Sequence, residues 1–244
     1  MKRRVKGVGR NSHSAPAVNL AVSQGLADAV DELDENADLS VAVITGAGGN
    51  FCAGIDLKAF AVGEVVAIPG RRLGFTERPP RKPLISAVEG YALAGGTEVV
   101  LATDLVVASR TAKFGIPEVK RGLVAAGGGL LRLPRRIPYQ KALELALTGD
   151  SFTAEQGEVW GFVNVVTEPD EPLAGAIELA ERITANGPLA VATTKEILVK
   201  SADWSEDEMW TKQLDHIISI FTSNDAKEGA IAFAEKRTPN WTGT

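Results

Sequence analysis

The sequence predicts an α/β fold that continues into a wholly helical C-terminal part. Short apolar runs at 41–44, 84–88 and 105–108 end at polar or turn-forming residues, which is typical of buried strands. Apolar residues at helical spacing lie between and around these runs. From residue 172 onward the pattern is almost entirely helical. The alternation indicates a layered α/β core, and the change of pattern places the transition to the helical part near residue 180.

The first helix is expected over Leu20–Leu33, where apolar side chains repeat every three or four residues, after an irregular basic segment. The stretch Gly90–Gly96 is interpreted as a small-residue turn. Pro117 predicts the start of another helix, because proline suits the first helical turn. The remaining elements are expected as strands at 113–115 and 163–166 and as helices at 97–102, 139–147, 153–157, 172–186, 188–202, 205–221 and 224–236.

The composition excludes several classes of protein. The 244 residues carry a net charge of −5, whereas a nucleic-acid-binding protein generally presents a basic face, so we expect no nucleic-acid partner. Cys52 is the only cysteine, which rules out a disulfide within the chain. No apolar run approaches the roughly 20 residues of a membrane span, and no hydrophobic stretch follows the basic start as in a secretory signal. We therefore expect a cytoplasmic protein without a membrane partner.

The common cofactor and metal motifs are incomplete in this sequence. The loop Gly46–Asn50 follows an apolar strand, as in dinucleotide-binding folds, but Phe51 stands where that motif needs its third glycine. Neither this loop nor Gly127–Gly129 provides the Gly-Lys-Ser/Thr ending of a phosphate-binding P-loop. His13 and His216 are isolated from other metal-binding side chains. We therefore expect no metal and no cofactor.

Two glycine-rich segments and two glutamates form a more specific pattern. The segments 51–57 and 90–98 each follow an expected strand, and their small residues let the backbone approach a ligand closely. Two backbone N–H groups, one from each segment, can converge on one oxygen atom as in an oxyanion hole. Glu98 and Glu118 each begin an expected helix, where a carboxylate alone would simply stabilise the helix dipole. Together, beside both loops, they indicate an acid–base pair.

These segments resemble the signature of the enoyl-CoA hydratase/isomerase family, the crotonases. The similarity covers about residues 19–244. The matching motifs are Ile85–Gly90, Gly95–Glu98, Thr103–Leu105, the first oxyanion loop Phe51–Leu57, the second catalytic segment Phe114–Glu118 and the C-terminal stretch Lys227–Pro239.

The resemblance implies a crotonase-type spiral of ββα units with a C-terminal helical trimerisation region. The spiral core is expected at 19–180 and the helical region at 181–244, and the implied assembly is a homotrimer or a dimer of trimers. Residues 1–18 depart from the family, because this irregular basic segment replaces its opening strands. Their loss is expected to expose a sheet edge and to weaken one wall of the coenzyme A site.

By position, the resemblance implies that the backbone N–H groups of Ile55 and Gly95 hold the thioester oxygen of an acyl-CoA substrate. It also implies a set of residues that contact coenzyme A. They are Ala53, Asp56, Leu57 and Lys58 along the adenine end, and Phe233 and Lys236 acting on a neighbouring subunit.

Glu98 and Glu118 both match family glutamates, and the resemblance therefore favours enoyl-CoA hydration. Water adds across the 2,3 double bond of a 2-enoyl-CoA and gives a 3-hydroxyacyl-CoA in fatty acid oxidation, with coenzyme A as part of the substrate. One open alternative is an enoyl-CoA isomerase, or another crotonase reaction through the same thioester enolate, which needs one essential carboxylate. The other is a non-catalytic acyl-CoA-binding protein, which the altered N-terminal segment leaves open.

Overall fold

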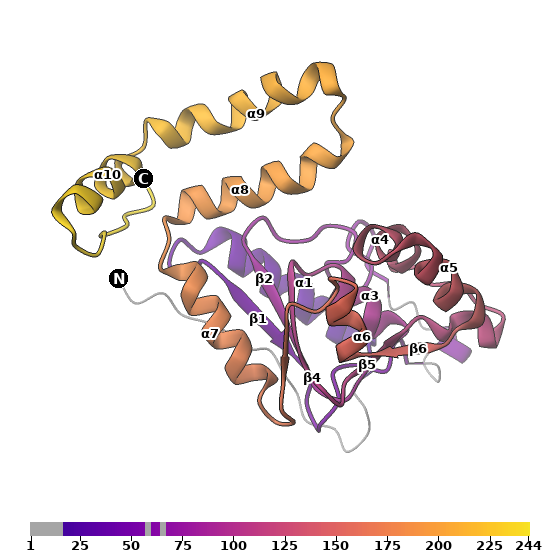
Figure 1. Cartoon of the computed structure of the whole chain (residues 1–244). Helices are drawn as coiled ribbons and strands as arrows, with labels where there is room; N and C mark the ends of the chain where they lie inside the picture. Colours follow the sequence, from indigo (N-terminus) through magenta and orange to yellow (C-terminus); the bar gives the residue numbers. More distant parts are fainter. Residues whose placement is uncertain (1–16, 57–59, 64–66) are drawn as a thin grey trace.

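Two β-sheets lie at the centre of the computed structural model, which describes residues 17–56, 60–63 and 67–244 (Figure 1). The larger sheet is parallel throughout and has the strand order β1-β2-β4-β7. The smaller sheet has the order β3-β5-β6, with β3 and β5 parallel and β6 antiparallel to β5. The strands are β1 (Ala42–Thr45), β2 (Leu84–Val88), β3 (Tyr91–Leu93), β4 (Leu105–Ser109), β5 (Lys113–Gly115), β6 (Ser151–Thr153) and β7 (Val165–Thr167).

Most of the expected helices are present, with small shifts at their ends. The strand expected at 163–166 also lies slightly later, as β7. The helices are α1 (Leu20–Glu35), α3 (Gly95–Leu101), α4 (Gly129–Arg136), α5 (Tyr139–Thr148), α6 (Ala154–Val159), α7 (Pro172–Thr184), α8 (Pro188–Lys200), α9 (Glu206–Phe221) and α10 (Asn224–Glu235), with 3₁₀ helices η1 (Pro117–Arg121) and η2 (Ser201–Asp203).

Both faces of the larger sheet are buried. Successive residues of each strand point to opposite faces, and each face packs against helices. Val43 and Ile85 pack with Ala176 and Ala180 of α7 on one face. Ile44 belongs instead to the larger apolar cluster that includes residues of α1 and α3 on the other face. Covering of both faces is the usual condition of parallel sheets, and it explains why these strands read as continuous apolar runs.

The interpretation of Gly90–Gly96 as a turn is wrong. Tyr91–Leu93 forms β3, which pairs with β5, and an isolated bridge joins Cys52 to Ala92. Helix α3 then begins already at Gly95. A three-residue strand is too short to show an alternating pattern, so it is defined by its partners rather than by its own sequence. The same reason explains why the sequence does not predict β6. It does not predict α4 because this helix begins at the last of three consecutive glycines and contains a proline.

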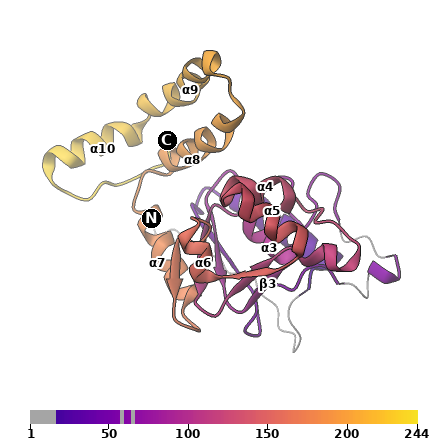
Figure 2. The ribbon, with the colours of Figure 1, turned by 45° about the vertical axis from the view of Figure 1, so that its right-hand side comes forward.

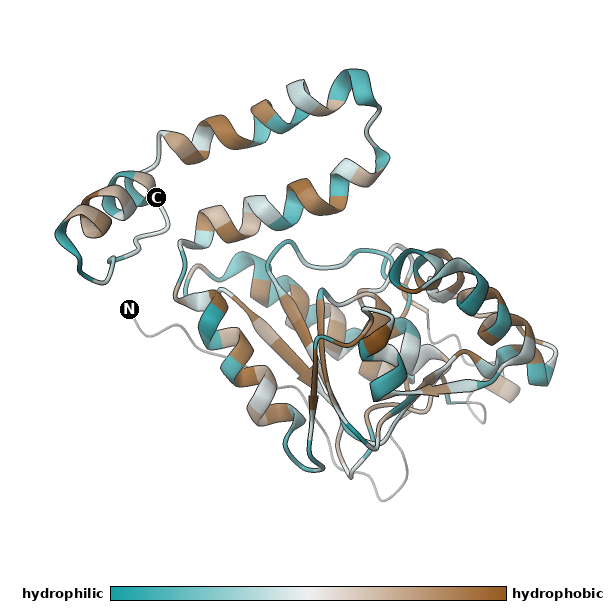
Figure 3. Cartoon of the chain, in the orientation of Figure 1, coloured by the Kyte–Doolittle hydropathy of each residue, from teal (hydrophilic) through white to brown (hydrophobic). Residues whose placement is uncertain are grey.

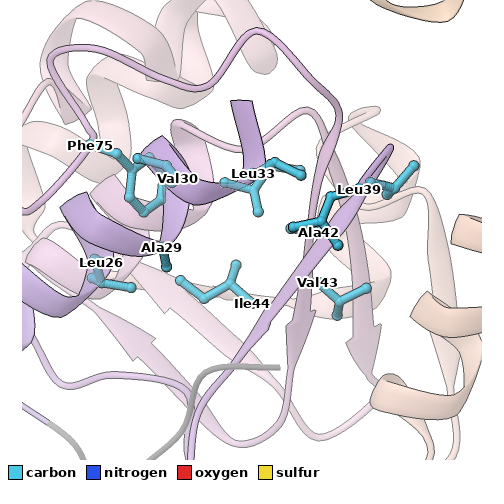
Figure 4. A pocket seen from close by; sticks show the side chains of 11 residues that line it. Leu26, Ala29, Val30, Leu33, Leu39, Ala42, Val43, Ile44 and Phe75 are labelled. Atoms are coloured by element: carbon cyan, nitrogen blue, oxygen red, sulfur yellow. The ribbon is translucent and has the colours of Figure 1, made fainter. Parts of the chain in front are cut away.

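A small apolar hollow of about 30 Å³ lies between α1 and β1 (Figure 4). Within the described residues, β1 is an edge strand of the larger sheet, and the hollow lies beside it. The expected exposure of a sheet edge depends on residues 1–16, which lie outside the described residues, so it stays a prediction. The lining residues are Leu26, Ala29, Val30, Leu33, Leu39, Val41, Ala42, Val43, Ile44, Phe75 and Leu84.

Helices α8, α9 and α10 extend away from the sheets as an arm (Figures 1 and 2). Lys195 of α8 attaches this arm to the core, because its Nζ donates to the carbonyl of Pro80 at 2.7 Å, to that of Lys82 at 2.9 Å and to Asp104 Oδ2 at 2.7 Å. The Lys195 side chain is only 13% exposed. None of the helices in the described part of the chain has the length and apolarity that a membrane span requires.

The attachment of the arm leads to a stability prediction for Lys195→Ala. The substitution leaves Asp104 and two backbone carbonyls without their shared donor, and breaking a buried ion pair in this way costs about 3 kcal/mol. We expect a loss of this size in urea unfolding at fixed protein concentration. Lys200→Ala is the control, because Lys200 of the same helix pairs with Glu196 at the surface and such pairs contribute about 0–1 kcal/mol. Equal losses in the two variants would contradict the assignment.

Candidate active site

The loop after β1 and the turn into α3 pack backbone against backbone. The N–H of Leu93 donates to the carbonyl of Cys52 at 2.9 Å. A Cβ on Gly96 would lie 2.2 Å from this carbonyl oxygen, and a Cβ on Gly54 would lie 2.8 Å from the Cβ of Ala94. The close approach therefore depends on glycine at both positions.

This packing brings two backbone amides close together. A Cβ on Gly95 would lie 3.6 Å from the nitrogen of Ile55. Ile55 is flanked by Gly54 O and Asp56 N–H, which both bond to Val18, so the N–H of Ile55 points to the opposite side. Gly95 is the first residue of α3, where an amide has no partner within the helix. In the part of the chain that the structure describes, neither of these two N–H groups has a hydrogen-bond acceptor.

The turn before α3 is held in a strained conformation. Ala94 has φ 51° and ψ −125°, which costs a residue with a side chain about 1–3 kcal/mol. Its N–H donates to the carbonyl of Gly115 at 2.8 Å. Thr97 Oγ1 donates to the carbonyl of Ala92 at 2.6 Å and accepts the N–H of Gly115 at 2.9 Å. These bonds fix the turn, and with it the position of the Gly95 amide.

Glu98 lies on α3, one turn after Gly95, and a glycine cradle holds its carboxylate. The residue is 4% exposed, and its Oε1 accepts the N–H of Gly129 at 2.9 Å. A Cβ on Gly127 would lie 2.7 Å from Oε2, and a Cβ on Gly129 would lie 3.1 Å from Oε1. Side chains at these two positions would push the carboxylate out of its place.

Glu118 lies in η1 directly after β5, and its carboxyl group has unused bonding capacity. Its Oε2 is buried and has no hydrogen-bond partner in the part of the chain that the structure describes. A buried polar atom without a partner costs about 1–3 kcal/mol, so such atoms in native proteins generally serve a water molecule or a ligand. The structure therefore places a free acceptor, or a free donor if the group is protonated, beside Glu98.

The two carboxyl groups occupy electrostatically different sites. The pKa of Glu98 is raised, because burial outweighs the hydrogen bonds from the Gly129 and Gly127 amides and the positive charges of Arg132 and Arg72, which lower it. These hydrogen-bond donors and cations stabilise the ionised form of Glu98.

The pKa of Glu118 is raised as well. Burial raises its pKa, and the negative charge of Glu98 raises it further, against a hydrogen bond from its own backbone and the charge of Arg121. A pair of carboxyl groups in such unlike surroundings can divide the roles of base and acid.

The raised pKa of Glu118 leads to a prediction for stability against pH. The folded state binds this proton more tightly than the unfolded state, so the contribution of Glu118 to stability is complete below its ordinary pKa of 4.5 and is lost as the pH rises through the higher folded value. In chemical unfolding from pH 4 to pH 8, Glu118→Gln should therefore gain stability relative to the parent as the pH rises.

Glu158→Gln is the control for this titration, because Glu158 is exposed on α6. It should show no such gain. A constant difference between parent and Glu118→Gln over the whole range would contradict the placement of Glu118 in a desolvated site.

The residues expected to contact coenzyme A are only partly brought together. Ala53 is exposed and Asp56 half-buried on the loop that carries Ile55, while Leu57 and Lys58 lie outside the described residues. Phe233 on α10 and Lys236 at its C-terminal end lie on the arm, and Figures 1 and 2 both show α10 apart from α3. Within one chain, these two residues do not reach the oxyanion loops.

Several residues of the site were not predicted from the sequence. From the sequence, Gly127–Gly129 indicates only that a phosphate-binding P-loop motif is incomplete. Three consecutive glycines are nevertheless a signal for close backbone approach. Arg132 and Leu73 give no comparable signal, because their place beside Glu98 depends on tertiary packing. No group of three metal-binding side chains occurs among the described residues, and the expectation of no metal stays a prediction.

A comparison with protein families identifies the family that shares this arrangement. Residues 10–244 match the family model of enoyl-CoA hydratase/isomerase. The chain belongs to this family. Its crotonase fold is shared with a crystal structure of enoyl-CoA hydratase from Mycobacterium tuberculosis H37Rv, with a TM-score of 0.97 and 64% identity over 100% of this chain and 97% of that chain.

The relatives of this crotonase differ in their substrates. Enoyl-CoA hydratase EchA19 of Mycobacterium tuberculosis is 41% identical over 240 residues, which cover 92% of this chain and 88% of the relative. Carnitinyl-CoA dehydratase of Salmonella arizonae is 42% identical over 238 residues, which cover 94% of this chain and 91% of the relative. Both names describe the addition or removal of water at an acyl-CoA, and they support the same kind of reaction for this chain.

Proposed function

We propose that this crotonase is an enoyl-CoA hydratase, which adds water across the 2,3 double bond of a 2-enoyl-CoA and gives a 3-hydroxyacyl-CoA in fatty acid oxidation. The observation that carries the proposal is the pair of unlike carboxyl groups. Glu98 is held by backbone donors, and Glu118 keeps a buried oxygen without a partner. Addition of water needs two proton transfers, one from the water and one to the substrate, and this pair supplies a group for each.

The proposed reaction begins with the thioester oxygen between the N–H groups of Ile55 and Gly95. These donors stabilise the negative charge that develops on the oxygen in the enolate. The water hydroxyl adds to carbon 3, and ionised Glu98 takes the other water proton. Protonated Glu118 gives its proton to carbon 2. After the product leaves, the proton on Glu98 returns to Glu118 by exchange through water, which restores the starting state. The steps use only these groups, water and the acyl-CoA.

Substitution of either glutamate tests the proposed roles. Glu98→Gln and Glu118→Gln keep nearly the same shape and remove the transferable proton, so each should lower the hydration of crotonyl-CoA by about 10²-fold or more. Loss of crotonyl-CoA absorbance measures the rate, and circular dichroism checks the fold. Glu158→Gln serves again as the exposed control and should keep the parent rate. Rates equal to that of the parent in both variants would show that neither Glu98 nor Glu118 takes part in the reaction.

The related carnitinyl-CoA enzymes suggest a second substrate for the same reaction. Carnitine carries a quaternary ammonium group, which proteins bind through aromatic or anionic side chains. The charged groups that act on Glu98 include Arg132 and Arg72, and the apolar Leu73 packs beside its glycine cradle. These surroundings favour an uncharged acyl group. Rates with crotonyl-CoA and with its 4-trimethylammonio derivative, measured side by side, separate the two substrates.

The other two alternatives differ in what they require of the glutamates. An isomerase needs one essential carboxylate, so it would process a 3-enoyl-CoA even when one of the two is replaced by Gln. A non-catalytic acyl-CoA-binding protein would bind crotonyl-CoA without turnover. The different hydrogen bonding of Glu98, which accepts a backbone N–H, and Glu118, which keeps a buried oxygen without a partner among the described residues, supports hydration over both.

We also propose that the chain assembles as a trimer or a dimer of trimers through its arm. Large apolar side chains are exposed on all three arm helices, and Figure 3 shows apolar stretches along them. Exposed apolar surface of this extent marks a protein–protein interface. Those that are at least 69% exposed are Leu198 (69%), Trp210 (73%), Phe221 (75%) and Phe233 (88%).

In such an assembly, Phe233 and Lys236 would approach coenzyme A bound to a neighbouring subunit. Light scattering at micromolar concentration should give the mass of three or six chains. Lys236→Ala should raise the KM for crotonyl-CoA at low salt, because a cation near phosphate is removed and ionic contacts are weakly screened there. Lys227→Ala is the control, since Lys227 is exposed on the same helix. A monomeric mass contradicts the assembly, and equal KM values in parent and Lys236→Ala contradict the contact.

A further inference from the structure

Leu73 lies between the two halves of the proposed site. Its Cδ1 is 3.1 Å from the position of a Cβ on Gly95 and 2.9 Å from that of a Cβ on Gly127. The first position adjoins an oxyanion donor, and the second lies 2.7 Å from Glu98 Oε2. A methyl group of Leu73 therefore lies beside the space that separates the thioester oxygen from the carboxylate. In the proposed reaction, this space holds carbons 2 and 3 of the acyl group.

The backbone that carries Leu73 is fixed on α1. Gly74 has φ 89°, and a Cβ there would lie 2.6 Å from the Ser23 carbonyl oxygen and 2.6 Å from the Cβ of Leu26. Arg71 also pairs with Asp31 of α1, with its Nη2 at 2.6 Å from each carboxylate oxygen. These contacts on one side leave little freedom for the segment to withdraw from the site.

The segment is held from the other side as well. Arg132 of α4, whose charge acts on Glu98, donates to the carbonyl of Thr76 at 2.6 Å. Leu73 itself is only 5% exposed. The segment 71–76 is thus attached to both α1 and α4, and these attachments on either side of Leu73 in the sequence fix the backbone that carries its buried side chain.

We propose that Leu73 is the specificity-determining residue that closes the site beside the reacting carbons and restricts the enzyme to 2-enoyl groups without a branch at these carbons. The inference rests on the proposed hydratase function and deepens it by naming the substrate class. An apolar wall of fixed position rejects an added methyl group by sterics alone. Such discrimination in an apolar pocket typically amounts to about 10–200-fold in kcat/KM.

The test is the ratio of kcat/KM for 2-methylcrotonyl-CoA to that for crotonyl-CoA. Leu73→Ala removes the wall, and we expect the ratio to rise about 10-fold or more. Leu73→Phe enlarges the wall and should lower the turnover of both substrates. Leu33→Ala is the matched control, because Leu33 is equally buried on α1 but lines the hollow beside β1. Its ratio should equal that of the parent, since a general loss of packing affects both substrates alike.

The possible results distinguish a failure of this inference from a failure of the proposed function. A parent protein that hydrates crotonyl-CoA, with an unchanged ratio in Leu73→Ala, overturns the role of Leu73 alone. A parent that hydrates neither substrate overturns the proposed function and the inference with it. If Leu73→Ala does not fold, Leu73→Val removes one methylene and must still raise the ratio above that of the parent. An unchanged ratio in that variant also overturns the inference.

Discussion

The close backbone packing between the loop after β1 and the turn into α3 is the constraint on which the rest of the site depends. Gly54 and Gly96 leave no room for a side chain, and the bridge between Cys52 and Ala92 holds the two segments together. The same packing positions two amides, and the strained turn that it requires begins α3. Because Glu98 lies one turn further along this helix, the position of the carboxylate follows from the position of the turn.

The division of roles between the two carboxyl groups follows from the elements that surround them. Glu98 projects from α3 toward the glycines at the start of α4, where backbone N–H groups stabilise its charge. Glu118 stands in a short 3₁₀ helix after β5, where burial and the neighbouring charge oppose ionisation. Leu73 closes the space between the oxyanion donors and this pair. In the proposed reaction, a single arrangement of backbone thus accounts for charge stabilisation, proton transfer and the fit of the acyl group.

The sequence predicted the buried strands, the long helices and the family, because apolar runs and ordered motifs are local properties. It did not predict β3, since three residues are defined as a strand only by their neighbours. Glu98 could be proposed from its motif, but its cradle at Gly127 and Gly129 could not, because the contact joins α3 to a turn and helix start far along the chain. The segment 62–77 has no informative polar pattern, so the place of Leu73 emerged only from the packing.

The central claim is that the amides of Ile55 and Gly95 polarise the thioester carbonyl. Isotope-edited infrared spectroscopy of crotonyl-CoA labelled at carbon 1 tests it directly, with the Glu118→Gln protein used to slow turnover. Two hydrogen bonds to the oxygen weaken the C=O bond, so the carbonyl band of the bound substrate should move to lower frequency than in water. The shift should shrink in Gly95→Val, where the added side chain would meet Leu73 Cδ1 at 3.1 Å and disturb the turn. A band at the frequency of free crotonyl-CoA in the bound complex would contradict the account.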